Sequence, residues 1–298
     1  MVSLPTYLIL FFSTFVCTLN STVIKKFSNR KPSRAFNAVS VATLSLVAGI
    51  VLLVWGGFGE ISTFSLLFGI AFGTVVFVNG FFTVLAFASG PWSYTFLIIC
   101  LSMLLPTFSG AVFWHEHITL QQYIGMVLVV LCFILSVEKD KDEKKANLKW
   151  IIFTVIAYLT SGSVGIMQKI HQTSVYADEL NAFLIVSFLA GALLSGISAI
   201  IFTVKDGFED HKVTPKELTS AFVMFIITGI TTATMHRLNL YLLGIMDAAV
   251  FFPIMNGVPI ILTSLIAFLV FKEKLTKKQW IGLSVGVVAV VLLTVQFG

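Results

Sequence analysis

Ten apolar stretches fill almost all of this chain, and they restrict its fold more than any other feature. Each is about 20 residues long, which is the length that an α-helix needs to cross a bilayer. Only 11% of the 298 residues are charged, whereas soluble domains carry about 25%. We therefore expect an all-α integral membrane protein. The ten expected spans are 4–24, 35–55, 64–88, 92–113, 120–137, 150–170, 180–204, 218–242, 248–271 and 280–296.

A twelve-residue motif occurs twice, 157 residues apart, each time between two of the apolar stretches. Trp114–Gly125 reads WHEHITLQQYIG, and Phe271–Gly282 reads FKEKLTKKQWIG. Both copies contain Thr-x-x-Gln, at Thr119 and Thr276, which matches a capping box. In a capping box the two side chains satisfy the free N–H groups at the start of a helix. The motif therefore predicts a tight turn that leads into a helix, in two copies.

Several other classes of protein are disfavoured by the same residues. His115-Glu116-His117 would suit a metal, but the second copy has lysine in place of both histidines, and a protonated lysine cannot ligate. We favour a structural turn there and expect neither a metal nor another cofactor. The chain has no phosphate-binding loop of the G-x-x-x-x-G-K-[ST] type, so we expect no ATP-driven cycle. Its net charge of +5 lies in short loops between spans, which does not favour a nucleic-acid partner.

The repeated turn resembles that of EamA-like transporters in the drug/metabolite transporter superfamily. Like this chain, those transporters have a helix, then a short E-x-L/I-T-x-x-Q turn, and then a helix that opens with an aromatic residue, Ile and Gly. The resemblance implies a permease or exporter of a metabolite or amino acid. It also implies two five-helix repeats, which we place at residues 1–141 and 150–298, joined by a charged linker at 142–149. Five spans per repeat make the second repeat enter the membrane in the opposite sense, as in many secondary transporters.

Positive charge predicts which loops face the cytoplasm. With all ten spans in place, 17 of the 19 Lys and Arg residues fall in the loops that follow odd-numbered spans. Cytoplasmic loops carry such an excess. We therefore expect Arg30, Lys144 and Lys277 to be cytoplasmic and both termini, including Gly298, to be exocytoplasmic. In a bacterium the bilayer would be the cell membrane.

Polar side chains inside the spans are the candidates for a substrate cavity. The fourth and ninth spans carry prolines at comparable places, with Ser102 aligned on Pro259 in the 157-residue register, and broken helices often mark a transporter's binding site. Pro106 also removes a hydrogen bond to the carbonyl of Ser102, which would free that carbonyl. Ser and Thr side chains could instead merely bond neighbouring helices. The expected cavity residues are Asn20, Thr22, Asn79, Trp92, Tyr94, Ser102, Ser163, Thr232, His236, Asn239 and Asn256.

Two adjacent basic residues of the eighth span point in opposite directions on a helical wheel. His236 shares a polar stripe with Thr228, Thr232 and Asn239, so any proton coupling is predicted to run through it, with a reference pKa of about 6.5. A structural histidine and uncoupled facilitation remain open alternatives. Arg237 lies on the other side, and we expect it to form a structural pair with Asp247.

The function expected from all of this is secondary transport of a small organic solute by alternating access, most simply as an exporter. A passive channel or a lipid-translocating protein remains possible, and an intramembrane enzyme is disfavoured because no carboxylate lies deep in a span. We also expect Gly282 and Gly286, four residues apart on one helix face, to pack on the fifth span near Gly125. The chain is expected to work as a monomer or a homodimer.

Overall fold

The computed structural model describes residues 4–28, 34–137, 144–206, 215–270, 272 and 275–294. Within these residues the chain is helical, apart from the short connections. Arg30, Phe271, Glu273, Lys274 and Gly298, on which some of the expectations above rest, lie outside the described residues.

The described helices match the ten expected spans to within a few residues. Nine candidate spans have the length and hydropathy needed to cross a membrane, and α6 is a shorter apolar helix of 17 residues. This confirms a multi-pass, all-helical membrane protein. The helices are α1 (Leu4–Ser28), α2 (Arg34–Gly56), α3 (Thr63–Ser89), α4 (Trp92–Leu101), α5 (Leu104–Phe113), α6 (Leu120–Ser136), α7 (Leu148–Gln172), the 3-10 turn η1 (Ala177–Glu179), α8 (Leu180–Asp206), α9 (Pro215–Leu243), α10 (Ala248–Leu269) and α11 (Lys277–Thr294).

The fourth span is broken into α4 and α5, as its proline suggested. The break lies at Ser102 and Met103, whose amides bond carbonyls three residues back rather than four. The carbonyl of Ser102 is not left free, however, because the amide of Leu105 donates to it at 3.1 Å. The ninth span behaves differently: α10 runs through Pro253 and Pro259 as a single helix.

The chain forms two compact units, which we describe separately. Unit 1 contains residues 1–18, 78–170 and 241–298, and unit 2 contains residues 19–77 and 171–240. Each unit therefore draws on both halves of the sequence, and the units do not coincide with the two predicted repeats.

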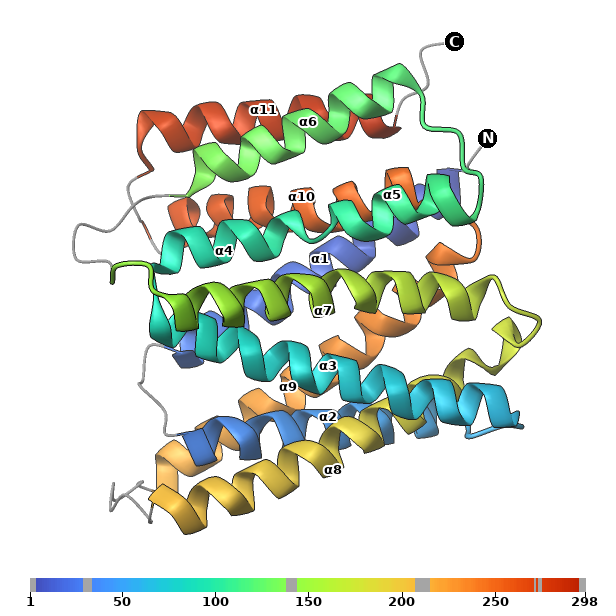
Figure 1. Cartoon of the computed structure of the whole chain (residues 1–298), viewed down its shortest axis with the longest axis vertical. Helices are drawn as coiled ribbons and strands as arrows, with labels where there is room; N and C mark the ends of the chain where they lie inside the picture. Colours follow the sequence, from blue (N-terminus) through green and yellow to red (C-terminus); the bar gives the residue numbers. More distant parts are fainter. Residues whose placement is uncertain are drawn as a thin grey trace. The chain divides into compact units, whose positions relative to one another are not determined.

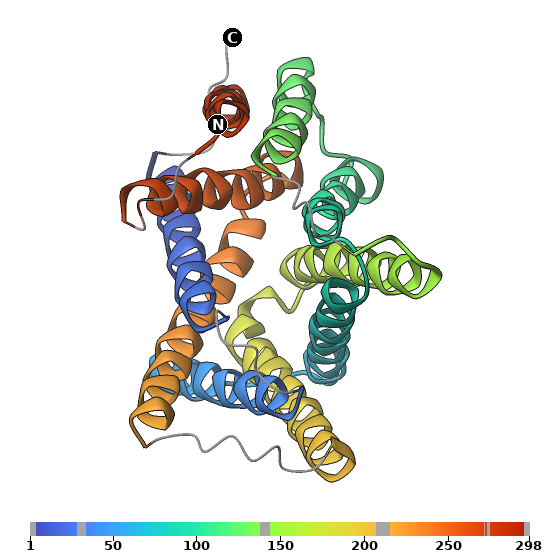
Figure 2. The ribbon, with the colours of Figure 1, turned by 90° about the vertical axis from the view of Figure 1, so that its left-hand side faces the viewer.

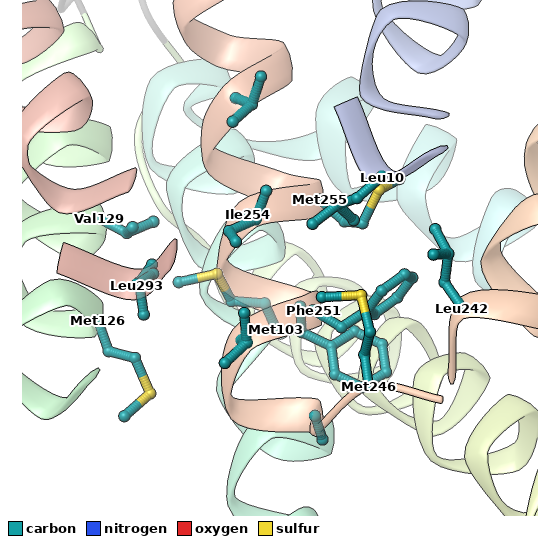
Figure 3. Close-up of a cluster of buried hydrophobic side chains, with 14 of the residues drawn as sticks. Leu10, Met103, Met126, Val129, Leu242, Met246, Phe251, Ile254, Met255 and Leu293 are labelled. Atoms are coloured by element: carbon teal, nitrogen blue, oxygen red, sulfur yellow. The ribbon is translucent and has the colours of Figure 1, made fainter. Parts of the chain in front are cut away.

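Unit 1 is built around α10, the most buried of the candidate spans. Phe251 and Ile254 of this helix are almost completely buried in a cluster that includes Leu10 of α1 and Val129 of α6. Figure 3 shows methionines in the same cluster, from α6, from α10 itself, from the break between α4 and α5, and from the α9–α10 turn. Methionine fills irregular gaps because its side chain is unbranched and flexible, so this core can be dense without precise shape matching.

Helices α6 and α11 pack closely in unit 1 (Figure 1). A Cβ on Gly286 would lie 2.7 Å from Sγ of Cys132, and one on Gly282 would lie 2.9 Å from Cβ of Leu135. A Cβ on Gly125 would instead meet Leu293. The close packing of the two helices is therefore as expected, but the partner of Gly282 is not: the helices are antiparallel, which brings Gly282 to the opposite end of α6 from Gly125.

Helices α2 and α8 form the corresponding antiparallel pair in unit 2 (Figures 1 and 2). Asn181 near the start of α8 donates to the carbonyl of Leu52 near the end of α2, whereas Gly49, one turn earlier, lies against Phe188. Gly73 of α3 approaches α8 so closely that a Cβ would collide with the carbonyl oxygen of Ser187. Small residues thus allow close backbone contact in unit 2 as well, as is common between helices in lipid.

Candidate functional site

The repeated motif has the predicted geometry in both copies. The Thr119 hydroxyl accepts from the amide of Gln122, whose side chain accepts from the amide of Thr119 at 2.8 Å. Thr276 and Gln279 make the same reciprocal bonds. The residue four positions before each threonine, His115 or Lys272, adopts a left-handed conformation with φ of 54° or 55°. At the positions that the structure describes in both copies, the capping bonds and the left-handed residue are therefore repeated along with the sequence.

Glu116 of the first turn forms a buried ion pair that the sequence did not reveal. Its Oε1 lies 2.9 Å from Nζ of Lys169 near the end of α7, and the two side chains are 7% and 8% exposed. Removing charges from water is costly unless further polar groups surround them. Both charges have such groups in unit 1.

The ends of two helices supply those groups. Nζ of Lys169 donates to the carbonyls of Leu243 and Met246, at and just beyond the end of α9, at 3.2 and 2.9 Å. Oε2 of Glu116 accepts from the amide of Ala248, the first residue of α10, at 2.7 Å. A helix carries partial negative charge at its C-terminus and partial positive charge at its N-terminus, so each ion faces the favourable end. The pair therefore fastens the α9–α10 turn to α7 and to the turn after α5.

A glycine makes room for this arrangement. A Cβ on Gly110 of α5 would collide with Oε2 of Glu116 and would lie 2.8 Å from Cβ of Ala248. The carbonyl of Gly110 also accepts from the amide of Glu116 at 3.2 Å. One feature of the sequence could have drawn attention to Lys169 without naming its partner: it is one of only two Lys or Arg residues outside the loops with excess positive charge, and Glu116 falls on the same predicted side.

Two of the expected cavity residues, Asn20 and Thr232, come together in unit 2. The buried amide of Asn20 donates to the hydroxyls of Thr231 and Thr232 at 2.9 and 2.8 Å. It also lies 3.2 Å from the carbonyl of Thr228. Asn20 thus connects α1 to three polar residues of α9, and we refer to these four residues as the Asn20 cluster. The cluster is neutral, and its amide and hydroxyl groups could form hydrogen bonds with a polar solute in place of those with one another.

In unit 1, two further expected residues reach the middle of α7. Ser102, at the break between α4 and α5, donates to the hydroxyl of Ser161 at 2.8 Å. The amide of Asn79 on α3 lies 3.0 Å from the carbonyl of Ala157 and 3.2 Å from the hydroxyl of Thr160. One short segment of α7 is therefore contacted by polar groups of two other helices, although neither Thr160 nor Ser161 was among the expected cavity residues.

The remaining expected residues have varied surroundings. Ser163 and Asn256 bond carbonyls of their own helices four residues back, at Leu159 and Phe252. Trp92 and Tyr94 are 56% and 45% exposed. Thr22 on α1 and Asn239 on α9 are half-buried in unit 2. Their part in a cavity stays a prediction, since the eleven expected residues are divided between the two units.

The adjacent His236 and Arg237 of α9 lie in unit 2 among aromatic groups. His236 is edge-on to Phe72 and Phe188, with ring centroids at 6.5 and 5.5 Å. Arg237 lies over the ring of Trp55 at 4.8 Å and donates to Oδ1 of Asn181 at 2.8 Å. Its expected partner Asp247 belongs to the other unit, so that pairing stays a prediction, and these contacts within unit 2 are partners that the sequence did not indicate.

Comparison with known proteins identifies the family. The sequence model of the EamA-like transporter family matches residues 148–295, a range that includes most of the second predicted repeat at 150–298. The chain belongs to this family within the drug/metabolite transporter superfamily, and it is a membrane transporter of that type. No match was found among curated proteins.

The fold is also similar to that of solved structures. One, whose title reads only "Crystal structure of protein", matches with a TM-score of 0.76 and 14% identity, over 97% of this chain and 96% of its own. Identity this low supports the fold alone.

Proposed function

We propose that the protein is a secondary transporter that moves a small organic solute, such as an amino acid, by alternating access, and that it acts as an exporter. The Asn20 cluster is the observation that carries this proposal. An unsatisfied amide in lipid costs several kcal/mol, so a buried asparagine marks a place where polar partners are always required. Hydroxyl groups that now bond Asn20 are suited to exchange those bonds for the polar groups of a solute.

An inverted repeat fits this mechanism, and we include it in the proposal. Within unit 2, α2 and α8 are the second helices of the two predicted repeats, and they pair antiparallel. Within unit 1, α6 and α11 are the last helices of the two repeats, and they also pair antiparallel. Antiparallel pairing of equivalent helices is what two repeats of opposite orientation would produce. We further propose that the termini are exocytoplasmic, from the charge bias alone.

Counterflow in proteoliposomes tests the transport mechanism. Vesicles that contain the purified protein are loaded with one candidate solute from a panel of amino acids, nucleosides and quaternary amines, and uptake of the labelled solute is followed. A carrier accumulates label transiently against the unlabelled load, whereas a channel only equilibrates it. Labelled lipid that changes leaflets without any solute counterflow would favour lipid translocation instead.

Two variants connect the transport assay to the structure. Asn20→Ala is expected to abolish counterflow, while Ser40→Ala, in which the lost hydroxyl bonds only a carbonyl of its own helix at 2.7 Å in the described structure, should transport normally. For coupling, we propose His236 as the proton carrier. With an imposed pH gradient, His236→Gln should remove the response to the gradient, and an unchanged response would reject this role.

A further inference from the structure

The guanidinium of Arg237 is held in place by three helices of unit 2. It lies 4.8 Å from the centre of the Trp55 ring, near the end of α2, and its Nη1 donates to Oδ1 of Asn181 at 2.8 Å. Asn181, at the start of α8, is itself fixed, because its side-chain nitrogen donates to the carbonyls of Leu52 and Gly57. The position of the cation is therefore defined by α2 and α8 as well as by α9.

A glycine makes room for the cation on one side. A Cβ on Gly56, the last residue of α2, would lie 2.8 Å from Nη1 of Arg237 and 3.0 Å from the side-chain nitrogen of Asn181. Trp55, one residue earlier, is 51% exposed, and Arg237 is half-buried. The guanidinium is therefore packed against the end of α2 and still keeps exposed surface.

The charge of Arg237 has no counter-ion in its own unit. Among the described residues of unit 2, Asn181 is the hydrogen-bond partner of the guanidinium, and no carboxylate pairs with it. The acidic residues of η1 directly precede α8, but Glu179 accepts from the amide and the hydroxyl of Ser62 instead. Arg237 belongs to a candidate membrane span, where a cation is costly and usually marks a binding site or a pair.

The end of α8 adds to the positive charge at this place. Asn181 is the second residue of α8, and the N-terminus of a helix carries partial positive charge. Lys169 in unit 1 has the opposite arrangement, because it donates to carbonyls at and just beyond the C-terminus of α9. At Arg237 a full positive charge and the positive end of a helix meet. Such a combination favours a bound anion.

We propose that Arg237, Asn181 and Trp55 form an oxyanion site, and that its ligand in the transport cycle is a carboxylate group of the solute. The second part rests on the proposed function. Asn181 takes Nη1, and within the described residues no bond is made by Nε or Nη2. The N–H groups on these two nitrogens form one edge of the guanidinium, which matches the two oxygens of a carboxylate or a phosphate. The predicted pairing with Asp247 would use the same donors, so the two hypotheses compete.

Anion binding can be measured without transport. The chain has three arginines, Arg30, Arg34 and Arg237. In a variant with Arg30→Lys and Arg34→Lys, Arg237 gives the single ¹⁵Nε–H arginine resonance in detergent micelles. Sodium acetate and sodium phosphate should each move this resonance until it saturates, whereas sodium chloride at the same ionic strength should have little effect. A response to acetate and phosphate that is no larger than the response to chloride overturns the site.

Two further titrations identify the source of the anion, because an anionic lipid head group offers the same oxygens as a solute. In nanodiscs of phosphatidylcholine, acetate should move the resonance equally with and without added phosphatidylglycerol. If phosphatidylglycerol moves it and acetate does not, the ligand is a lipid head group and the assignment to the solute is wrong. If acetate acts only after Asp247→Asn, Asp247 holds the guanidinium in the wild type, and the proposal is overturned.

The counterflow assay tests whether the solute is the ligand. The wild type should carry amino acids better than the corresponding neutral amino-acid amides. Arg237→Gln should raise KM for the carboxylate solute about tenfold and leave KM for the amide unchanged, since the amide lacks the charge that the guanidinium binds. Lys149→Gln is the matched control, because it removes one positive charge at an exposed position of unit 1 and should transport normally.

The outcomes of this assay separate the site from the proposed function. Equal transport of acid and amide by the wild type, a comparison that needs no variant to fold, overturns the assignment of the ligand to the solute. A wild type without any transport counts against the proposed function and leaves the ¹⁵N titration to decide the oxyanion site.

Discussion

The Glu116–Lys169 pair and the Asn20 cluster are both buried and polar, but they solve the problem of burial in opposite ways. Glu116 and Lys169 carry full charges, and each is satisfied by its partner and by the end of a helix. Asn20 is neutral, and its amide contacts two hydroxyls, of which that of Thr231 also bonds a carbonyl of its own helix. The charged pair fastens the α9–α10 turn to α7, whereas the neutral cluster carries hydrogen bonds that our proposal assigns to the solute. The predictions below test whether the first stabilises the structure and the second binds the solute.

The largest expected effect is the loss of one charge of the pair. Lys169→Met leaves Glu116 buried without a counter-ion, and breaking a buried pair in this way costs about 3–5 kcal/mol. Thermal unfolding in detergent should therefore show a strongly destabilised protein. Adding Glu116→Leu to this variant removes the orphaned charge and should restore much of the stability. If Lys169→Met alone is as stable as the wild type, the ion pair does not hold the turn in place.

A smaller effect should follow from crowding the pair without touching its charges. Gly110→Ala places a methyl group where Oε2 of Glu116 now lies, and overpacking of this kind costs about 1–3 kcal/mol. Gly80→Ala on α3 is the matched control, because within the described part of the chain the added Cβ meets nothing within 4 Å beyond its own stretch of helix. The difference in unfolding temperature between the two variants measures how tightly Glu116 is held. Equal temperatures would show that the carboxylate moves aside freely.

The Asn20 cluster should respond in function more than in stability. Thr232→Val removes one hydroxyl partner, and interhelical hydrogen bonds in membranes average about 0.6 kcal/mol, so the unfolding temperature should change little. The apparent KM for the transported solute should nevertheless rise, because Thr232 is expected to contact it. A variant with unchanged kinetics and a large loss of stability would reverse the distinction between the two sites.

The last prediction concerns location only and should leave both stability and transport unchanged. From the charge bias, Lys144 and Lys277 should be cytoplasmic, and the turn that carries Glu116 should face the other side. In a variant that lacks Cys17, Cys100 and Cys132, a single cysteine at position 144 or 277 should resist an impermeant maleimide in intact cells. If the cysteine at position 144 is labelled from outside, the predicted orientation in the membrane is wrong and the opposite one holds. A cysteine at the exposed position 117 should be labelled and serves as the control.

Hydropathy and the repeated turn were enough to predict most of the fold. The helix ends fall close to the expected ones because the apolar runs are separated by charged residues, proline or glycine, and the capping boxes at Thr119 and Thr276 are local interactions. The break at Ser102 could likewise be expected from Pro106, whereas the continuity of α10 through two prolines could not. In α10 the helix is surrounded by the apolar core of unit 1, and this packing outweighs the lost hydrogen bonds.

The polar contacts were predicted less well, because they depend on which helices become neighbours. Thr232 of the polar stripe of α9 contacts Asn20, and the sequence grouped these two residues only through the family resemblance. Glu116 and Lys169 are 53 positions apart, and no sequence pattern links one to the other. Arg237 was assigned to Asp247 because they are near in sequence, whereas its partners in unit 2, Asn181 and Trp55, come from α8 and α2.

The left-handed residues His115 and Lys272 bear on how a duplicated gene segment could diverge. Both turns need the same backbone conformation, yet the flanking side chains of the first copy are histidines and those of the second are lysines. If the copies lie on opposite faces of the membrane, as the charge bias predicts, each is under a different demand during insertion: one must retain positive charge in the cytoplasm, and the other must be translocated. A turn defined by its backbone and by Thr and Gln leaves these flanking positions free to change, so two copies of such a turn could take opposite orientations in the membrane without losing their shape.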